Sequence, residues 1–180
     1  MYGIVNKAIE ELVLENFGSA AWDRIKQKSG IDTDFFLSNE SYDDKITFDL
    51  AQAISHEAGM PFDQVMITFG EYWVLKTGRE KYGSLMQAGG SNLRDFLLNL
   101  PDFHSRILLI YPNLTPPEFR VTITEANSIL LHYHSKREGL QEFVRGLLQG
   151  LCKMFETPAS IELVQSRQQG SDHEIFKIDF

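Results

Sequence analysis

Three residues at alternate positions, Tyr133, Ser135 and Arg137, carry side chains that could bind an anion. Tyrosine and serine hydroxyls donate hydrogen bonds, and the arginine guanidinium is a planar fork of donors that keeps its charge. Side chains at i, i+2 and i+4 of an extended segment point to the same side. The spacing therefore predicts a site for one or two carboxylates or phosphates, between an apolar strand and an amphipathic helix.

A histidine, His104, lies about thirty residues upstream in an apolar helical pattern. It shares one helix face with Ile107, Leu108 and Tyr111, at the spacing i, i+3, i+4 and i+7. Burial disfavours the charged imidazole, and the neutral form is the one that binds a metal. A haem needs only one such ligand. The alternative is a structural histidine bonded to a carbonyl group.

Composition restricts what such a site could serve. The 180 residues suit one domain with a real core, and the 13 phenylalanines could also line a flat apolar ligand. The net charge of −8 argues against nucleic acid as a partner, because nucleic-acid binding calls for a basic surface. The positive charge of Arg137 is thus a local exception in an acidic chain.

The sequence also bears on the compartment. Cys152 is the single cysteine, so no disulfide can form within the chain, which fits a reducing environment. The first residues lack a basic region followed by a long apolar run, and no apolar stretch is long enough to span a bilayer. We expect a cytoplasmic protein that does not bind membranes.

Helical spacing of apolar residues dominates the first two thirds of the chain. Ser19 is expected to cap one helix, Thr47 to open another, and Pro61 to begin a third. Thr77 and Gly78 separate two short helices, and Pro112 ends the last helix of this part. The expected helices cover residues 4–16, 19–28, 47–58, 61–69, 73–76, 82–86, 92–100 and 101–111.

After Pro116 and Pro117 the apolar period changes from 3.6 to 2, which indicates strands. Helices followed by an antiparallel sheet with one long helix make an α+β protein. We expect one domain, 1–180, with a helical part at about 1–60 and a part that contains the sheet at about 61–180. The expected elements after Pro117 are strands at 119–124, 129–133, 160–165 and 174–180 and a helix at 138–155.

Several short motifs occur together along the whole chain. They are Met1-Tyr-Gly-Ile-Val-Asn-Lys7, Phe69-Gly-Glu-Tyr-Trp73, Pro101-Asp-Phe-His104, Pro116-Pro117, Tyr133-His-Ser135-Lys-Arg137 and Gly146-Leu-Leu-Gln-Gly150. In this combination the sequence resembles the H-NOX family of haem nitric oxide/oxygen binding domains, as a cyanobacterial-like stand-alone member. This family is related to the haem domain of soluble guanylate cyclase.

The resemblance implies haem b as the cofactor and assigns a role to each matching residue. His104 would be the proximal iron ligand, and Tyr133, Ser135 and Arg137 would bind the haem propionates. Pro117 would press on the porphyrin, and Ile4 would touch it on the distal side. Residues 1–60 would then form the distal part and residues 61–180 the proximal part.

The choice of gas depends on the distal pocket. Relatives that bind dioxygen stably have a distal tyrosine where this chain has Glu142, and the neighbouring Phe143 and Leu147 offer no hydroxyl. We expect Glu142 to point to solvent, because an unpaired buried carboxylate is costly. Trp73 has an indole N–H that could act as a donor, although we interpret it as pocket filling. We therefore predict binding of nitric oxide and carbon monoxide rather than stable binding of dioxygen.

The same resemblance implies a gas sensor and not an enzyme. Nitric oxide would weaken the bond to His104, and its release would let the two parts of the domain shift relative to each other. The length of the chain suggests a separate effector, such as a histidine kinase or a cyclic-di-GMP enzyme. Two rivals stay open: a haem enzyme of the peroxidase type, which needs a distal acid or base, and a haem-free module that binds an organic anion through Arg137.

Overall fold

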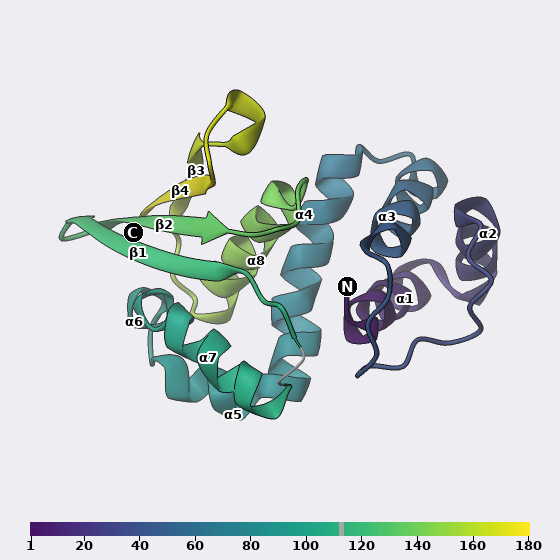
Figure 1. Ribbon diagram of the computed structural model, residues 1–180, viewed down its shortest axis with the longest axis horizontal. Helices are drawn as coiled ribbons and strands as arrows, with labels where there is room; N and C mark the ends of the chain where they lie inside the picture. Colours follow the sequence, from purple (N-terminus) through teal and green to yellow (C-terminus); the bar gives the residue numbers. More distant parts are fainter. Residues whose placement is uncertain (112–113) are drawn as a thin grey trace.

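The predicted α+β class is confirmed in a computed structural model, which describes residues 1–111 and 114–180. Figure 1 shows three N-terminal helices at one end of the molecule and the sheet at the other, with the helix labelled α4 between them. The N-terminal helices are α1 (Gly3–Phe17), α2 (Ser19–Ser29) and α3 (Asp44–Ala58). No helix in the described ranges has the length and apolar character needed to cross a bilayer.

Two predicted helix starts are wrong. Helix α2 is preceded by Gly18, and Ser19 is its first helical residue rather than its cap. Helix α3 begins at Asp44, where the side chain of Asp43 accepts a hydrogen bond from the backbone N–H of Lys45. Thr47 is instead buried inside α3, and its hydroxyl donates to Asn6 Oδ1 over 2.6 Å. The threonine at position 47 predicts a helix start because its hydroxyl could cap a helix, but this hydroxyl bonds to a residue of α1 instead.

The break predicted at Thr77 and Gly78 is absent. Helix α4 (Phe62–Tyr72) passes directly into a π-helical segment, η1 (Trp73–Gly78), which passes into α5 (Arg79–Gly89). Thr77 and Gly78 thus lie inside a wider π turn, and the chain stays helical through them. Such turns are frequent at functional sites. Helix α5 ends at Gly89, and Gly90 follows it with φ 157° and ψ 154°.

Two short helices then lead to the sheet. In α6 (Leu93–Leu98) the cap is Asn92, and in α7 (Leu100–Ile110) the first turn contains Pro101, as the sequence predicts. The role predicted for Pro112 as a helix stop lies outside the described residues.

The sheet consists of four antiparallel strands in the order β1-β2-β4-β3. Its strands alternate between buried and more exposed residues most clearly in β2, where Ile129, Leu131 and Tyr133 face the core. The long helix α8 (Gln141–Met154) follows β2, somewhat shorter than predicted. The strands are β1 (Glu118–Glu125), β2 (Ser128–His134), β3 (Ser160–Gln165) and β4 (Glu174–Asp179).

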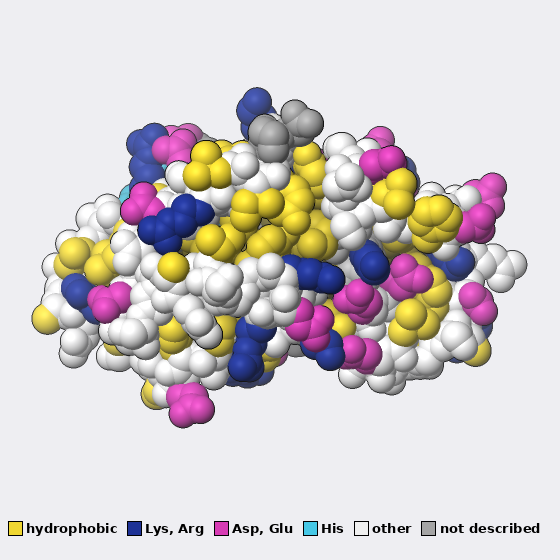
Figure 2. Space-filling model, turned by 90° about the horizontal axis from the view of Figure 1, so that it is seen from below, with side chains coloured by type: hydrophobic (Ala, Val, Ile, Leu, Met, Phe, Trp, Pro, Cys, Tyr) yellow, Lys and Arg dark blue, Asp and Glu magenta, His cyan; other side chains and the backbone are white. Residues whose placement is uncertain are grey.

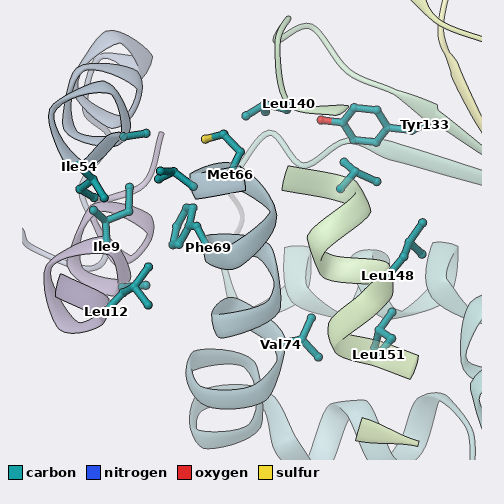
Figure 3. Close-up of a cluster of buried hydrophobic side chains, with 14 of the residues drawn as sticks. Ile9, Leu12, Ile54, Met66, Phe69, Val74, Tyr133, Leu140, Leu148 and Leu151 are labelled. Carbon is teal, nitrogen blue, oxygen red and sulfur yellow. The ribbon is translucent and has the colours of Figure 1, made fainter. Parts of the chain in front are cut away.

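Helices α4 and α8 approach each other closely because glycines lie at their contact. A methyl group on Gly70 would overlap the carbonyl oxygen of Phe143, and one on Gly146 would overlap that of Ile67. Figure 3 shows Met66 and Phe69 beside the side chains of α1 and α3, and Leu148 on α8 beyond α4. The α4–α8 pair thus forms a central wall with apolar side chains on both sides.

Candidate functional site

A cavity of about 250 Å³ lies between the N-terminal helices, the α4–α8 pair, α7 and the sheet. Its lining is mostly apolar and includes residues between Met1 and Leu151 that lie far apart in the sequence. It adjoins a larger hollow of about 1050 Å³, and the residues that line both hollows are His104, Leu114, Thr115, Pro116, Pro117, Phe119, Ser135 and Arg137. Figure 2 shows hydrophobic side chains gathered around a hollow near the middle of one face of the molecule.

We call one set of lining residues the apolar end of the cavity. It consists of Ile4, Val5, Phe69, Trp73, Phe143 and Leu147, which come from α1, α4, η1 and α8. The rings of this set pack on one another: the centroids of Phe69 and Phe143 are 5.0 Å apart, and those of Phe69 and Trp73 are 6.4 Å apart. Among these six side chains, the indole N–H of Trp73 is the one hydrogen-bond donor. This end can hold a small apolar or weakly polar molecule.

The lining residues shared by the two hollows form what we call the mouth, and His104 lies there. The ring nitrogen Nδ1 of His104 is 3.1 Å from the carbonyl oxygen of Leu100, one turn earlier in α7. A carbonyl only accepts, so Nδ1 carries the proton and donates, and Nε2 keeps its lone pair. Burial lowers the pKa of His104, although the bond to Leu100 acts in the opposite direction. The imidazole is therefore neutral and oriented, as a metal ligand requires.

Aromatic contacts connect His104 with the strand that carries Tyr133. The His104 ring lies 5.1 Å from the ring of Phe119 on β1, and the Phe119 ring lies 5.4 Å from that of Tyr133 on β2. Phe119 and Tyr133 are paired across the two strands. In Figure 3 the Tyr133 ring extends from β2 toward Leu140, just before α8. The predicted ligand and the predicted anion site are thus neighbours in space, although α7 and β2 are separate elements.

The anion clamp, which we define as Tyr133, Ser135 and Arg137, lines the cavity as a group. Strand β2 ends at His134, so the extended geometry assumed from the spacing covers only the first part of the clamp. Beyond it, the hydroxyl oxygen of Ser135 accepts a hydrogen bond of 3.0 Å from the backbone N–H of Arg137. Burial raises the pKa of Tyr133, so its hydroxyl keeps its proton and can donate.

Arg137 has a partner that sequence reasoning missed. Its Nε donates to Asp44 Oδ2 over 2.8 Å, and one of its terminal nitrogens donates to the carbonyl oxygen of Thr115 over 3.1 Å. The other oxygen of Asp44 binds the N-terminal amine of Met1. Burial alone would raise the pKa of Asp44, but the bonds from the amine and from Arg137 outweigh it and hold that pKa below its usual range. Asp44 therefore joins the N-terminal helices to the clamp.

The prediction that Glu142 points to solvent is wrong. It is outside the described lining of the cavity, and its carboxylate accepts a hydrogen bond of 2.8 Å from Nε of Arg145. Its side chain is only 18% exposed. The prediction assumed an unpaired carboxylate, and pairing with Arg145 offsets part of the cost of burying it.

The structure adds hydroxyl groups to the cavity that the sequence did not suggest. Thr47 is committed to Asn6, as described above. Tyr82 lines the cavity and packs edge-to-face on Tyr111, and burial together with a hydrogen bond to Tyr111 raises its pKa. Tyr2 also contributes to the lining. These residues come from separate segments of the chain, and only tertiary packing brings them to the same cavity.

Three histidines outside the cavity, His132, His134 and His173, form a cluster. His132 Nδ1 lies 3.0 Å from His173 Nε2, and His173 Nδ1 lies 2.6 Å from Asp172 Oδ1. The rings of His134 and His173 are stacked 4.0 Å apart. In the described part of the chain, no set of three or more His, Cys, Asp or Glu side chains is arranged to hold a metal ion. His56, on α3, is exposed.

Comparison with known proteins decides which family has this arrangement. The family model described as "Haem-NO-binding" matches residues 2–163. The chain belongs to this family. Its members are haem-binding gas-sensor domains, so the resemblance inferred from the motifs is confirmed.

Curated relatives of this Haem-NO-binding domain include soluble guanylate cyclases of Caenorhabditis elegans. It is 29% identical to gcy-32 over 96% of this chain, and 25% identical to gcy-31 over all of it. In both cases it spans only 26% of the relative's length.

Solved structures share the fold. An H-NOX protein from S. oneidensis in the Fe(II)NO state superposes with a TM-score of 0.90 at 22% identity, over 99% of this chain and 98% of the other. An unliganded Fe(II) H-NOX protein from K. algicida has a TM-score of 0.86 at 24% identity, over 99% of this chain and 96% of the other. The predicted fold is therefore found in the family that the motifs indicated.

The residues around the cavity fit a haem. A neutral histidine with a free Nε2 could bind an iron, an apolar lining rich in aromatic side chains could contact a macrocycle, and the donors at the mouth could bind its carboxylates. These groups occur together in one continuous space.

Proposed function

We propose that this chain is a sensor of nitric oxide that also binds carbon monoxide at ferrous haem and does not hold dioxygen stably. The apolar end of the cavity is the observation that carries the proposal. Bound dioxygen draws negative charge from the iron and benefits from a hydrogen-bond donor, whereas the other two gases depend less on one. Phe69, Phe143 and Leu147 offer no donor at this end, and Trp73 offers only its indole N–H.

Several residues that line the cavity have a proposed role in binding haem. Haem, when bound, would supply a ferrous iron that can bind a diatomic gas. We propose that Nε2 of His104 binds the iron, since Nδ1 is held by the Leu100 carbonyl. Pro117 and Ile4 line the cavity and are proposed to contact the porphyrin.

The clamp is proposed to hold the haem propionates. The guanidinium of Arg137 suits a carboxylate because it can donate two parallel hydrogen bonds, and the hydroxyls of Tyr133 and Ser135 add neutral donors. We propose haem b rather than a covalently attached haem. Attachment of the c type uses a Cys-x-x-Cys-His motif, and this chain has a single cysteine.

The proposed signal is a movement of α7. His104 ties α7 to the cofactor, and its release would leave α7 held by its packing against α5, α6 and β1. The part at about 1–60 would then shift relative to the part at about 61–180. The ion pair between Asp44 and Arg137 links the two parts and would be affected by this shift. A gas biases such an equilibrium only through its different affinities for the two states.

The receiver of the signal is proposed to be a separate signalling protein, such as a histidine kinase or a cyclic-di-GMP enzyme. This part of the proposal is supported by analogy within the family. The single Cys152 fits a reducing compartment, and we propose the cytoplasm.

The absorption spectrum of the ferrous protein tests the proposal. We expect distinct spectral shifts with nitric oxide and with carbon monoxide, and oxidation without a stable oxy spectrum in air. A stable oxy spectrum would overturn the gas selectivity. A colourless protein purified under haem-replete conditions would favour the haem-free anion module, and rapid turnover of peroxide would favour a haem enzyme.

A further inference from the structure

A second arginine, Arg167, lies behind the clamp. It begins the short 3-10 turn η2 (Arg167–Gln169) between β3 and β4. One terminal nitrogen of its guanidinium donates to the carbonyl oxygen of Ser135 over 2.9 Å, and the other donates to that of Arg137 over 2.6 Å. Both acceptors belong to clamp residues, and both lie after the end of β2, where the strand ladder no longer fixes the backbone.

The third side of the same guanidinium is occupied by Glu174. Nε of Arg167 lies 3.0 Å and 3.1 Å from the two carboxylate oxygens of Glu174, whose side chain is only 3% exposed. Glu174 is the first residue of β4 and pairs with Tyr133 across the β2–β4 ladder. Arg167 therefore binds the backbone of Ser135 and Arg137, and its counterion Glu174 is the strand partner of Tyr133.

We propose that Arg167, with Glu174 as its buried counterion, is a positioning residue that sets the shape of the clamp and so controls how fast haem leaves. The inference rests on the proposed binding of the haem carboxylates by Tyr133, Ser135 and Arg137. Arg167 lies beyond residues 2–163, which the family model matches.

The planar shape of the guanidinium is what the position requires. The fork of Arg167 donates to two carbonyls and a carboxylate, so it fixes the peptide groups that follow Ser135 and Arg137. The N–H of Arg137 is in turn fixed on Ser135 Oγ. Arg167 can thus direct the Arg137 side chain without touching the ligand. A lysine could neutralise Glu174 but could not reproduce this fork.

The experiment compares Arg167→Gln with a matched control, Arg145→Gln. Arg145 is 23% exposed, pairs with Glu142, and donates to the carbonyl oxygen of Ile161 over 3.0 Å, but it lies away from the clamp. Each protein is loaded with haem b, or with haem whose two propionates are methyl esters. The rate of haem transfer to excess apomyoglobin is then measured.

For haem b, we expect Arg167→Gln to accelerate haem loss by up to about tenfold, near the lower end of the cost of losing a hydrogen bond to a charged group. For the dimethyl ester, the same change should have less than about a twofold effect, because the ester has no carboxylate for the clamp to hold. Arg145→Gln should have less than about a twofold effect with either haem. In an Arg137→Gln background, Arg167→Gln should add little for haem b.

Two results would overturn the inference. One is an unchanged rate with haem b, and the other is an equal acceleration with both haems, which would indicate general loosening of the fold. If the wild type releases haem b and its ester at the same rate, the proposed carboxylate clamp itself is wrong.

Arg167→Lys carries the same test if Arg167→Gln fails to fold because Glu174 is left unpaired. We expect Arg167→Lys to accelerate the loss of haem b about threefold, which is midway on a logarithmic scale between no change and tenfold. With the ester we expect no acceleration. An Arg167→Lys protein that matches the wild type with haem b would also contradict the role of the guanidinium fork.

Discussion

The two ends of the cavity are built in different ways. Side chains from α1, α4, η1 and α8 form the apolar end through ring and aliphatic packing. The mouth is formed by α7, the start of β1 and the segment after β2, and its polar atoms are directed by hydrogen bonds to Leu100, Ser135 and Thr115. Under the proposed function, the mouth would hold the cofactor and the apolar end would select the gas.

The largest effect is expected at the mouth, from His104→Gly. Loss of a hydrogen-bond partner of a metal ligand lowers metal affinity by roughly 10–100-fold. Loss of the ligand itself should lower haem affinity by more than this. Added imidazole should bind in the space left and restore the spectrum of the ferrous wild type. The exposed His56, changed to Gly on α3, is the control and should leave the spectrum unaltered. An imidazole-insensitive variant would show that His104 is not the ligand.

At the apolar end, Phe143→Tyr adds a hydroxyl with little change in shape. Phe143 lines the cavity and packs on Phe69. A donor there should slow dioxygen loss from the ferrous protein by about tenfold to a hundredfold, because the acceptor carries partial negative charge. Flash photolysis measures the rates. Phe48→Tyr, near Gly139 and outside the described lining, is the control. An unchanged dioxygen rate would mean that the missing hydroxyl does not decide gas selectivity.

A smaller effect is expected from Arg137→Gln. The variant keeps a polar side chain but loses the charge, and we expect haem b to dissociate about tenfold faster. The effect is moderate because the Arg137 side chain is 24% exposed and water can replace part of its hydrogen bonding. Carbon monoxide binding at the apolar end should stay the same. If the gas kinetics changed as much as haem retention, the two ends would not be separable.

The smallest effect is expected from Asp44→Asn. The pKa of Asp44 is held below its ordinary value of 3.8, so the carboxylate stabilises the fold above that pH, and this contribution is lost as the pH falls through the lowered pKa. The side chain is 38% exposed, so we expect a loss of less than about 1 kcal/mol at pH 7.

Urea unfolding at pH 7 and pH 3 measures this difference, which should shrink at the lower pH. Asp49→Asn on the same helix removes an exposed pair with Lys45 and serves as the control. A difference between Asp44→Asn and the wild type that grows at pH 3 would contradict the assigned sign.

Local sequence patterns predicted most of the elements and several of the residues that meet at the cavity. The change of period after Pro117 located the sheet, because side-chain direction alternates in a strand wherever it lies. His104 was expected on an apolar helix face, and the structure places it at the mouth. Errors occurred where a tertiary contact overrode a local signal, as at Thr47, which bonds to Asn6 instead of opening its helix.

The partners of the clamp could not be predicted in the same way. Asp44 lies 93 positions from Arg137, and Arg167 lies 30 positions from it. Neither spacing follows from a helix or strand period, so no periodic pattern connects them. Their contribution depends on how α3 and the β3–β4 connection pack around the segment after β2.

The sequence by itself determined the α+β class, the family and the residue types of the proposed haem site. Residue identity and short spacing carry that information, since a lone pair, a charge and an apolar surface are properties of side chains. Only the tertiary structure decided that His104 donates through Nδ1, that Asp44 and Arg167 hold the clamp from two sides, and that Glu142 pairs with Arg145. Hydrogen bonds have strict requirements for distance and direction, and the folded chain alone satisfies them.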